Sequence, residues 1–173
     1  MNWKKNLAKL IDISDFSDRQ IYAWTNITPS VISKISKEKL ENLKVEHFIK
    51  LMLLFKKDYK QFVFEIFGEN YFADVSLINK PEKITPLGTI LSKYYHFESL
   101  ITKKELSKAT GILSSRINYI LAIEDATVKV DELTKIELAL SLPIGTLAQK
   151  RFSKIKLNTP KEYELILKKL KDK

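Results

Sequence analysis

The feature that most constrains the fold of this chain is an internal repeat with an offset of 85 residues. The stretch "FSDRQIYAWTNITPSVISKI" (16–35) aligns with "ITKKELSKATGILSSRINYI" (101–120), and the alignment continues without a gap to residues 67 and 152. Along it the apolar positions coincide, as in the pairs Phe16/Ile101, Ile21/Leu106, Ile27/Ile112, Ile32/Ile117 and Ile35/Ile120. A repeat of this length predicts two copies of one domain.

Both copies carry the periodicity of helices. Apolar residues recur with the i, i+3, i+4, i+7 spacing, the chain holds only 4 glycines, and no alternating run typical of a strand stands out. Capping boxes mark several helix starts, because a Ser or Thr and a Glu or Gln three positions later together satisfy exposed backbone N–H groups. These boxes are Ser17 with Gln20, Thr102 with Glu105, and Thr159 with Glu162. Prolines suited to a first helical position follow Thr28, Thr85 and Thr159. The sequence therefore predicts an all-α protein.

The predicted organisation is two tandem five-helix domains followed by a C-terminal helix. The N-terminal domain spans 1–67, a linker 68–84, the C-terminal domain 85–152 and a basic C-terminal helix 153–173. The expected helices lie at about 3–12, 18–25, 29–37, 45–56 and 59–67 in the first copy, and at about 86–97, 103–110, 114–122, 130–141 and 145–152 in the second. The C-terminal helix has an apolar stripe formed by Tyr163, Ile166, Leu167 and Leu170. We expect that stripe to pack across the second domain or against its twin in a homodimer.

The charge of the chain favours a polyanionic partner. Lysine and arginine total 30 against 21 acidic residues, which gives a net charge of +9 and attracts nucleic acid electrostatically. A lysine-rich surface without such a partner is the alternative. The absence of cysteine, together with only 2 histidines, argues against disulfides and zinc clusters.

Other functional classes have no support in the residues. No phosphate-binding loop, nucleophile triad or pair of catalytic carboxylates is recognisable, so we expect no enzymatic activity, no cofactor and no metal. The richest apolar runs, "LMLLF" and "FVFEIF", are too short to cross a bilayer, and the N-terminus has no apolar stretch of signal-peptide length. We therefore expect a cytoplasmic protein without membrane contact.

Each copy contains a short helix, a tight turn and a second short helix. Gly111 stands at the turn in the second copy and Asn26 in the first, and these residue types tolerate a left-handed backbone best. Isoleucines three positions apart should anchor one face of the second helix in the core, namely Ile32 with Ile35 and Ile117 with Ile120. This arrangement is a helix-turn-helix unit, whose second helix can enter the major groove of DNA.

On these residues, the stretches "KKELSKATGILSSRINYIL" and "VDELTKIELALSLPIGTL" resemble the five-helix DNA-binding domain of the phage-repressor and Cro-like (Xre-type) helix-turn-helix family. The resemblance is better over residues 87–152 and more diverged over residues 3–67. It implies sequence-specific binding of double-stranded DNA, usually for transcriptional control. Because the two second helices differ, the preferred DNA site should be asymmetric.

The resemblance also implies which residues contact DNA. Base contacts would come from the second helix of each unit, at Ser114, Ser115, Arg116, Asn118 and Tyr119 and at Ser30, Ser33 and Lys34. Arginine suits guanine and asparagine suits adenine through paired hydrogen bonds. Phosphate contacts would come from Thr102, Lys103, Lys104, Arg19, Thr28 and Lys37. The alternative for all of them is an ordinary solvated helix face.

A protein-interaction module, such as an antitoxin or a co-regulator, is the alternative function. In this reading one or both domains bind a protein partner and not DNA. Asp18, Val31 and the aromatic residues of the first copy keep it open. His47 aligns with Glu132 on a face that is expected to be polar, whereas Trp3 and Trp24 fall at core or interdomain spacing.

Overall fold

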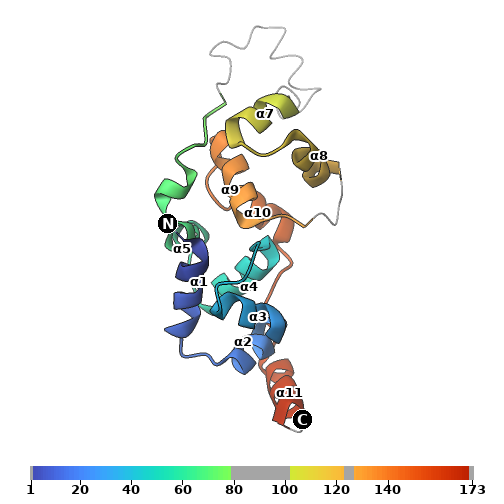
Figure 1. The fold of residues 1–173 in the computed structure, drawn as a ribbon. Helices are drawn as coiled ribbons and strands as arrows, with labels where there is room; N and C mark the ends of the chain where they lie inside the picture. The colour runs from blue at the N-terminus through green and yellow to red at the C-terminus, as the bar shows by residue number, and fades with distance from the viewer. Residues whose placement is uncertain (1, 79–101, 123–126, 172–173) are drawn as a thin grey trace.

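The computed structural model describes residues 2–78, 102–122 and 127–171, and within these ranges the fold is all-α with no strand (Figure 1). A first group of helices contains α1 (Trp3–Asp12), α2 (Asp18–Thr25), α3 (Pro29–Ser36), α4 (Val45–Leu54), α5 (Tyr59–Phe67) and the 3-10 helix η1 (Glu69–Phe72). A second group contains α7 (Lys103–Thr110), α8 (Ser114–Ala122), α9 (Val130–Ala139) and α10 (Thr146–Phe152). Helix α11 (Pro160–Lys171) follows.

The predicted helix starts are confirmed wherever the structure describes them, except that α10 begins one residue late and the C-terminal helix begins at Pro160, after its capping box, and not at residue 153. All three capping boxes form, because the side chains of Ser17, Thr102 and Thr159 accept from the amides three positions on. Asp58 caps the start of α5, because its side chain accepts from the Gln61 amide at 3.1 Å. The expected helix over 86–97, Pro86 and His96 lie outside the described residues.

The ends of α4 and α9 come two residues earlier than the sequence predicted. Each helix is followed at an equivalent place by a residue with a left-handed backbone, Lys56 (φ 53°) and Ser141 (φ 55°). The amides of Lys57 and Leu142 then donate back to carbonyls five residues earlier, at 3.0 and 2.8 Å. This is the hydrogen-bond pattern of a Schellman motif. No glycine stands at either end. The apolar pattern therefore predicted helices that continue two residues too far.

One large apolar core extends across both groups. Fully buried side chains of the first group, including Leu7, Ile21, Ile32, Phe48 and Phe62, share a cluster with residues of the second. The second group contributes Ile120, Val128, Val130, Leu133 and Ala148. A smaller cluster lies wholly within the second group around Ile117 and Ile136. Because the main core is shared, the two groups should unfold together.

An antiparallel backbone bridge joins equivalent positions of the two copies. Lys44 pairs with Lys129, which lies 85 positions later. The amide of Val45 donates to the Val128 carbonyl, and the amide of Val130 donates to the Leu43 carbonyl, both at 3.0 Å. Exchanging the copies leaves this set of contacts unchanged. Such a self-complementary contact is the signature of a local two-fold axis, and here the axis passes through the bridge.

The segments that follow the two groups are exchanged between them. Residues 73–78, within the expected linker, lie on the second group, where the Ser76 amide donates to the Ala109 carbonyl at 2.9 Å. Residues 153–159 return to the first group, where the Asn158 amide donates to the Trp24 carbonyl at 2.8 Å. Trp24 and Ala109 are equivalent positions of the repeat. The exchange therefore repeats the two-fold relation of the bridge.

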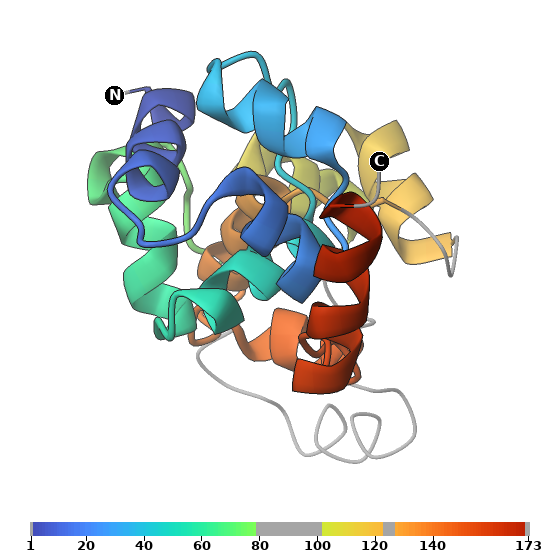
Figure 2. The ribbon, with the colours of Figure 1, turned by 90° about the horizontal axis from the view of Figure 1, so that it is seen from below.

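Helix α11 packs on α2 of the first group, so the expectation that it crosses the second domain is wrong (Figure 2). The ring of Tyr163 stacks on that of Trp24, with centroids 4.3 Å apart and planes 19° apart. The predicted stripe residues of α11 are all half-buried, whereas Leu165 is exposed. Trp24 is thus an inter-element contact, as its spacing predicted.

Candidate nucleic-acid interface

Both tight turns have the same local geometry. Asn26 (φ 54°) and Gly111 (φ 70°) adopt the left-handed conformation, and their amides donate to carbonyls four residues earlier at 2.8 and 2.9 Å. Before each stands a buried threonine, Thr25 or Thr110. Its hydroxyl donates to the carbonyl four residues back and accepts from the amide two residues on. These local bonds fix the direction in which the next helix leaves.

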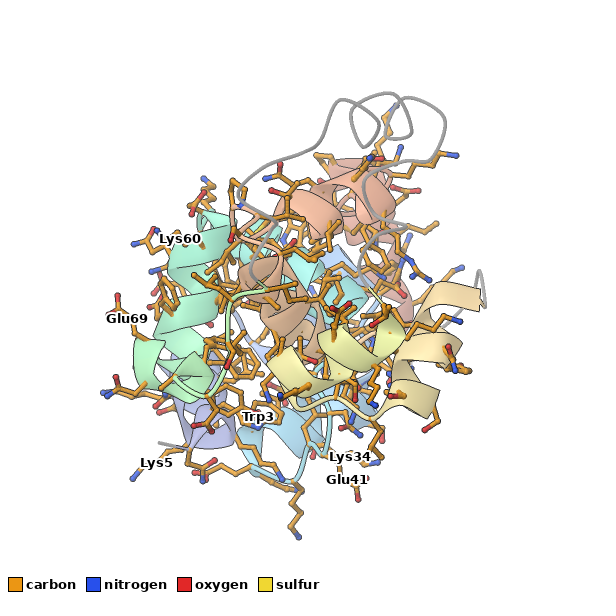
Figure 3. All side chains as sticks on the ribbon, turned by 90° about the horizontal axis from the view of Figure 1, so that it is seen from above. Trp3, Lys5, Lys34, Glu41, Lys60 and Glu69 are labelled. Carbon is orange, nitrogen blue, oxygen red and sulfur yellow. The ribbon has the colours of Figure 1, made fainter. Side chains whose placement is uncertain are left out.

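The first group presents a polar face on α3. Ile32 and Ile35 are buried, as predicted, which turns the other side of the helix to solvent. Lys34 points outward from the molecule (Figure 3). The other candidates Thr28, Ser30 and Lys37 are also exposed, while Ser33 is half-buried.

The second group presents a comparable face on α8. Ile117 and Ile120 are buried, while Ser114, Ser115, Asn118 and Tyr119 are exposed. Leu113, just before the helix, keeps 73% of its surface exposed, the largest fraction among the exposed large apolar residues described. Sequence reasoning missed Leu113, although an apolar residue at this turn position, where the first copy has Thr28, was a visible signal. An exposed apolar side chain here could contact a thymine methyl group or a protein.

Arg116 is held inside the second group by an ion pair. Its Nε and Nη2 donate to Oε1 and Oε2 of Glu132 at 2.8 and 2.7 Å, and Nη2 also donates to the Thr127 carbonyl at 2.6 Å. The guanidinium carbon lies 5.0 Å from the ring centroid of Tyr119. The donors most suited to a bidentate guanine contact are therefore already occupied, and Arg116 joins α8 to the start of α9.

Glu132 and His47 lie less exposed than the sequence indicated. Glu132, expected on a polar face, keeps 7% of its surface exposed and also accepts from the Lys129 amide at 3.1 Å. Burial alone would raise the pKa of Glu132, but the bonds from Arg116 and Lys129 lower it below its ordinary value. His47 occupies the equivalent position in the first copy and is half-buried, and burial lowers its pKa. In the first copy, Val31 occupies the position equivalent to Arg116.

The remaining phosphate-contact candidates lie at the starts of α2 and α7. Lys103, Lys104 and Arg19 are exposed, while Thr102 is exposed but holds its capping partner Glu105 at 2.7 Å. Asp18 is exposed beside Arg19, which lowers the positive potential at that end of the first group.

A second pair of lysines, absent from the sequence-based candidates, lies at the bridge. The hydrogen bonds on either side of Lys44 and Lys129 make them a non-hydrogen-bonded pair, whose side chains project close together on one face. They line an open hollow of about 610 Å³ together with Asn42, Leu113 and Arg116. The paired lysines therefore lie beside the turn that leads into α8.

The described residues hold no group of three or more His, Cys, Asp or Glu side chains that could bind a metal ion. Within the same ranges, no helix is long and apolar enough to span a membrane.

Comparisons with family models, with curated proteins and with solved structures give no match to this chain. The functional interpretation therefore depends on the geometry described above.

Proposed function

We propose that the chain is a double-stranded DNA-binding protein, a transcriptional regulator in which α2–α3 and α7–α8 are two helix-turn-helix units of tandem Xre-like domains. The observation that carries this proposal is the repeated geometry. Two outward polar helices, each preceded by a left-handed turn, belong to copies related by the axis through the Lys44–Lys129 bridge. One chain would thus imitate a symmetric dimer, which usually presents two such helices about 34 Å apart on DNA.

The charge and its placement support the same proposal. The net charge is +9, exposed lysines occur on α3, at the start of α7 and at Lys44 of the bridge, and Lys129 of the bridge is half-buried. Phosphate contacts of this kind supply much of the affinity of DNA-binding proteins and make it salt-dependent. Among the candidate base contacts, Asn118 is exposed, and asparagine can read adenine.

The test is selection of binding sites from a pool of random duplexes, followed by fluorescence anisotropy with the recovered site at several salt concentrations. We expect a consensus and an affinity that falls steeply with salt. Asn118→Ala should cost about 1–3 kcal/mol and relax the preference at one base pair. Lys34→Ala should weaken binding more than Lys60→Ala, which removes the same charge from an exposed site on α5.

Binding to a protein partner is the second candidate function. Leu113 is exposed, Tyr119 is 37% exposed, and the guanidinium of Arg116 is occupied by Glu132, so the start of α8 is less polar than its sequence indicated. This candidate would be favoured if selection returned no consensus and if Leu113→Ser abolished capture of a specific protein that Lys60→Ala leaves intact.

A further inference from the structure

We propose that Asn158 is a positioning residue for α3, so that DNA recognition by the first group depends on the C-terminal segment. This inference rests on the proposed DNA-binding function and assigns a role to residues outside both helix-turn-helix units. Its basis is a set of contacts that the return segment 153–159 makes at the end of α2.

Asn158 satisfies the last carbonyl groups of α2. The final carbonyls of a helix have no partner within the helix and need one from elsewhere. The Asn158 side-chain amide donates to the Ala23 carbonyl at 2.7 Å, and its backbone amide donates to the Trp24 carbonyl at 2.8 Å. One residue, 135 positions from Ala23, therefore completes the end of the helix that precedes the turn.

The same residue holds the turn itself. The side-chain amide of Asn26 donates to Oδ1 of Asn158 at 2.9 Å. Asn26 is the left-handed residue of the turn, and only two residues separate it from α3. Its side chain therefore has a use beyond tolerance of the left-handed backbone, because it ties the turn to the return segment.

The second copy holds its turn differently. Gly111 has no side chain, and the local bond is instead made by the Ser107 hydroxyl, which donates to the Ile112 carbonyl at 2.6 Å. The equivalent position in the first copy is Tyr22, which cannot make that short bond in the same way. Dependence on the C-terminal segment is consequently a property of the first group alone.

Helix α11 keeps Asn158 in place. It begins two residues after Asn158, and Tyr163 stacks on Trp24 in the same helix α2. Release of α11 would free the return segment, and the Asn26 side chain would lose its acceptor. The position of α3 would then be fixed by the turn alone, and its base contacts would become less specific.

The experiment uses the full chain and the operator recovered by selection. Lys34→Ala first identifies the half-site read by α3, because protection from hydroxyl radicals should weaken there. Asn158→Ala and Tyr163→Leu are then compared with Leu165→Ala, a matched control at an exposed site on the same α11 helix. We expect the first two variants to lose protection of the α3 half-site about tenfold and to relax its base preference, with the other half-site and the control unchanged.

Docking of α11 is measured independently of DNA. In a Trp3→Phe background, Trp24 is the single tryptophan. Its emission reports in Asn158→Ala whether Tyr163 still stacks on it, and its quenching by acrylamide reports in Tyr163→Leu whether α11 still covers it. If emission shows that α11 is released while both half-sites stay equally protected, Asn158 has no positioning role, although the chain still binds DNA. If the wild-type chain selects no operator, the proposed function fails and this inference fails with it. Having two variants guards against loss of folding in one of them.

Discussion

Replacing Arg116 by alanine should destabilise the protein by about 3 kcal/mol. The substitution removes both hydrogen bonds from Arg116 to the carboxylate of Glu132, which is 7% exposed, and leaves it the bond from the Lys129 amide. Breaking a buried ion pair by removing one partner costs about 3–5 kcal/mol. The Arg116 side chain keeps 27% exposure, which places the cost at the lower end. With about 2–4 °C per kcal/mol for a unit of this size, Tm should fall by about 9 °C.

A double-mutant cycle separates the ion pair from simple loss of packing. Val31 and His47 stand at the equivalent positions of the first copy, so Arg116→Val and Glu132→His transplant a pair that this fold already tolerates. Urea unfolding followed by circular dichroism should show that the double variant is more stable than the sum of the single losses predicts, by about 2 kcal/mol of coupling. A coupling energy near zero would show that the pair contributes no net stability and would refute the predicted cost of Arg116→Ala.

The pair also predicts how stability depends on pH. The pKa of Glu132 is lowered in the folded protein, so its contribution is present above the unfolded value, about 4.5, and is lost as pH falls through the folded value. The gap in stability between wild type and Arg116→Ala should therefore shrink as pH falls below about 4.5. An unchanged gap at low pH would contradict the assignment of the lowered pKa to this pair.

Two further perturbations test the axis and the turns. Lys44→Ser and Lys129→Ser should each reduce the salt slope of DNA affinity by about one unit if the pair meets phosphate; unchanged slopes would place the pair away from DNA. Lys44→Ser should also stabilise the free protein by up to about 1 kcal/mol because like charges no longer face each other, whereas Lys129→Ser should not, because the Lys129 ammonium also lies 4.0 Å from the Glu132 carboxylate. Gly111→Ala should cost about 1–2 kcal/mol through its positive φ alone, since nothing lies within 4 Å of an added Cβ. Gly145→Ala should cost more in urea unfolding, because its Cβ would also lie 2.9 Å from the Tyr59 ring; equal costs would refute the close approach of the two groups.

The helices could be predicted from the sequence because their signals are local. Capping pairs such as Ser17 with Gln20 act over three residues, and the spacing of Ile32 and Ile35 identifies the buried face of α3. The helix ends at Lys56 and Ser141 were not predictable in the same way, because lysine and serine rarely adopt a left-handed backbone. Tertiary packing imposed that conformation at positions where the sequence has no glycine to predict it.

Contacts between distant segments could not be predicted from the sequence for a different reason. The stripe of α11 was visible, but nothing in its periodicity distinguishes a partner in the first group from one in the second. The pairing of Arg116 with Glu132 left a weak signal, because both charges are missing together at Val31 and His47 in the other copy. Considered separately, Arg116 was assigned to DNA and Glu132 to solvent. Only the replacement of both in the first copy indicates that they bind each other.

The two copies are alike at the bridge where they meet and unlike on the faces that are proposed to contact DNA. The bridge keeps lysine and valine at both equivalent pairs, Lys44 with Lys129 and Val45 with Val130, and the exchanged segments bind equivalent carbonyls. By contrast, the outward residues of α3 and α8 are almost all different. If the chain binds DNA, this arrangement favours a site with two unequal halves around a common centre. The bridge fixes the spacing of α3 and α8, while each of these helices sets its own base preference. A symmetrised operator should therefore bind less tightly than the selected site, whichever half is duplicated.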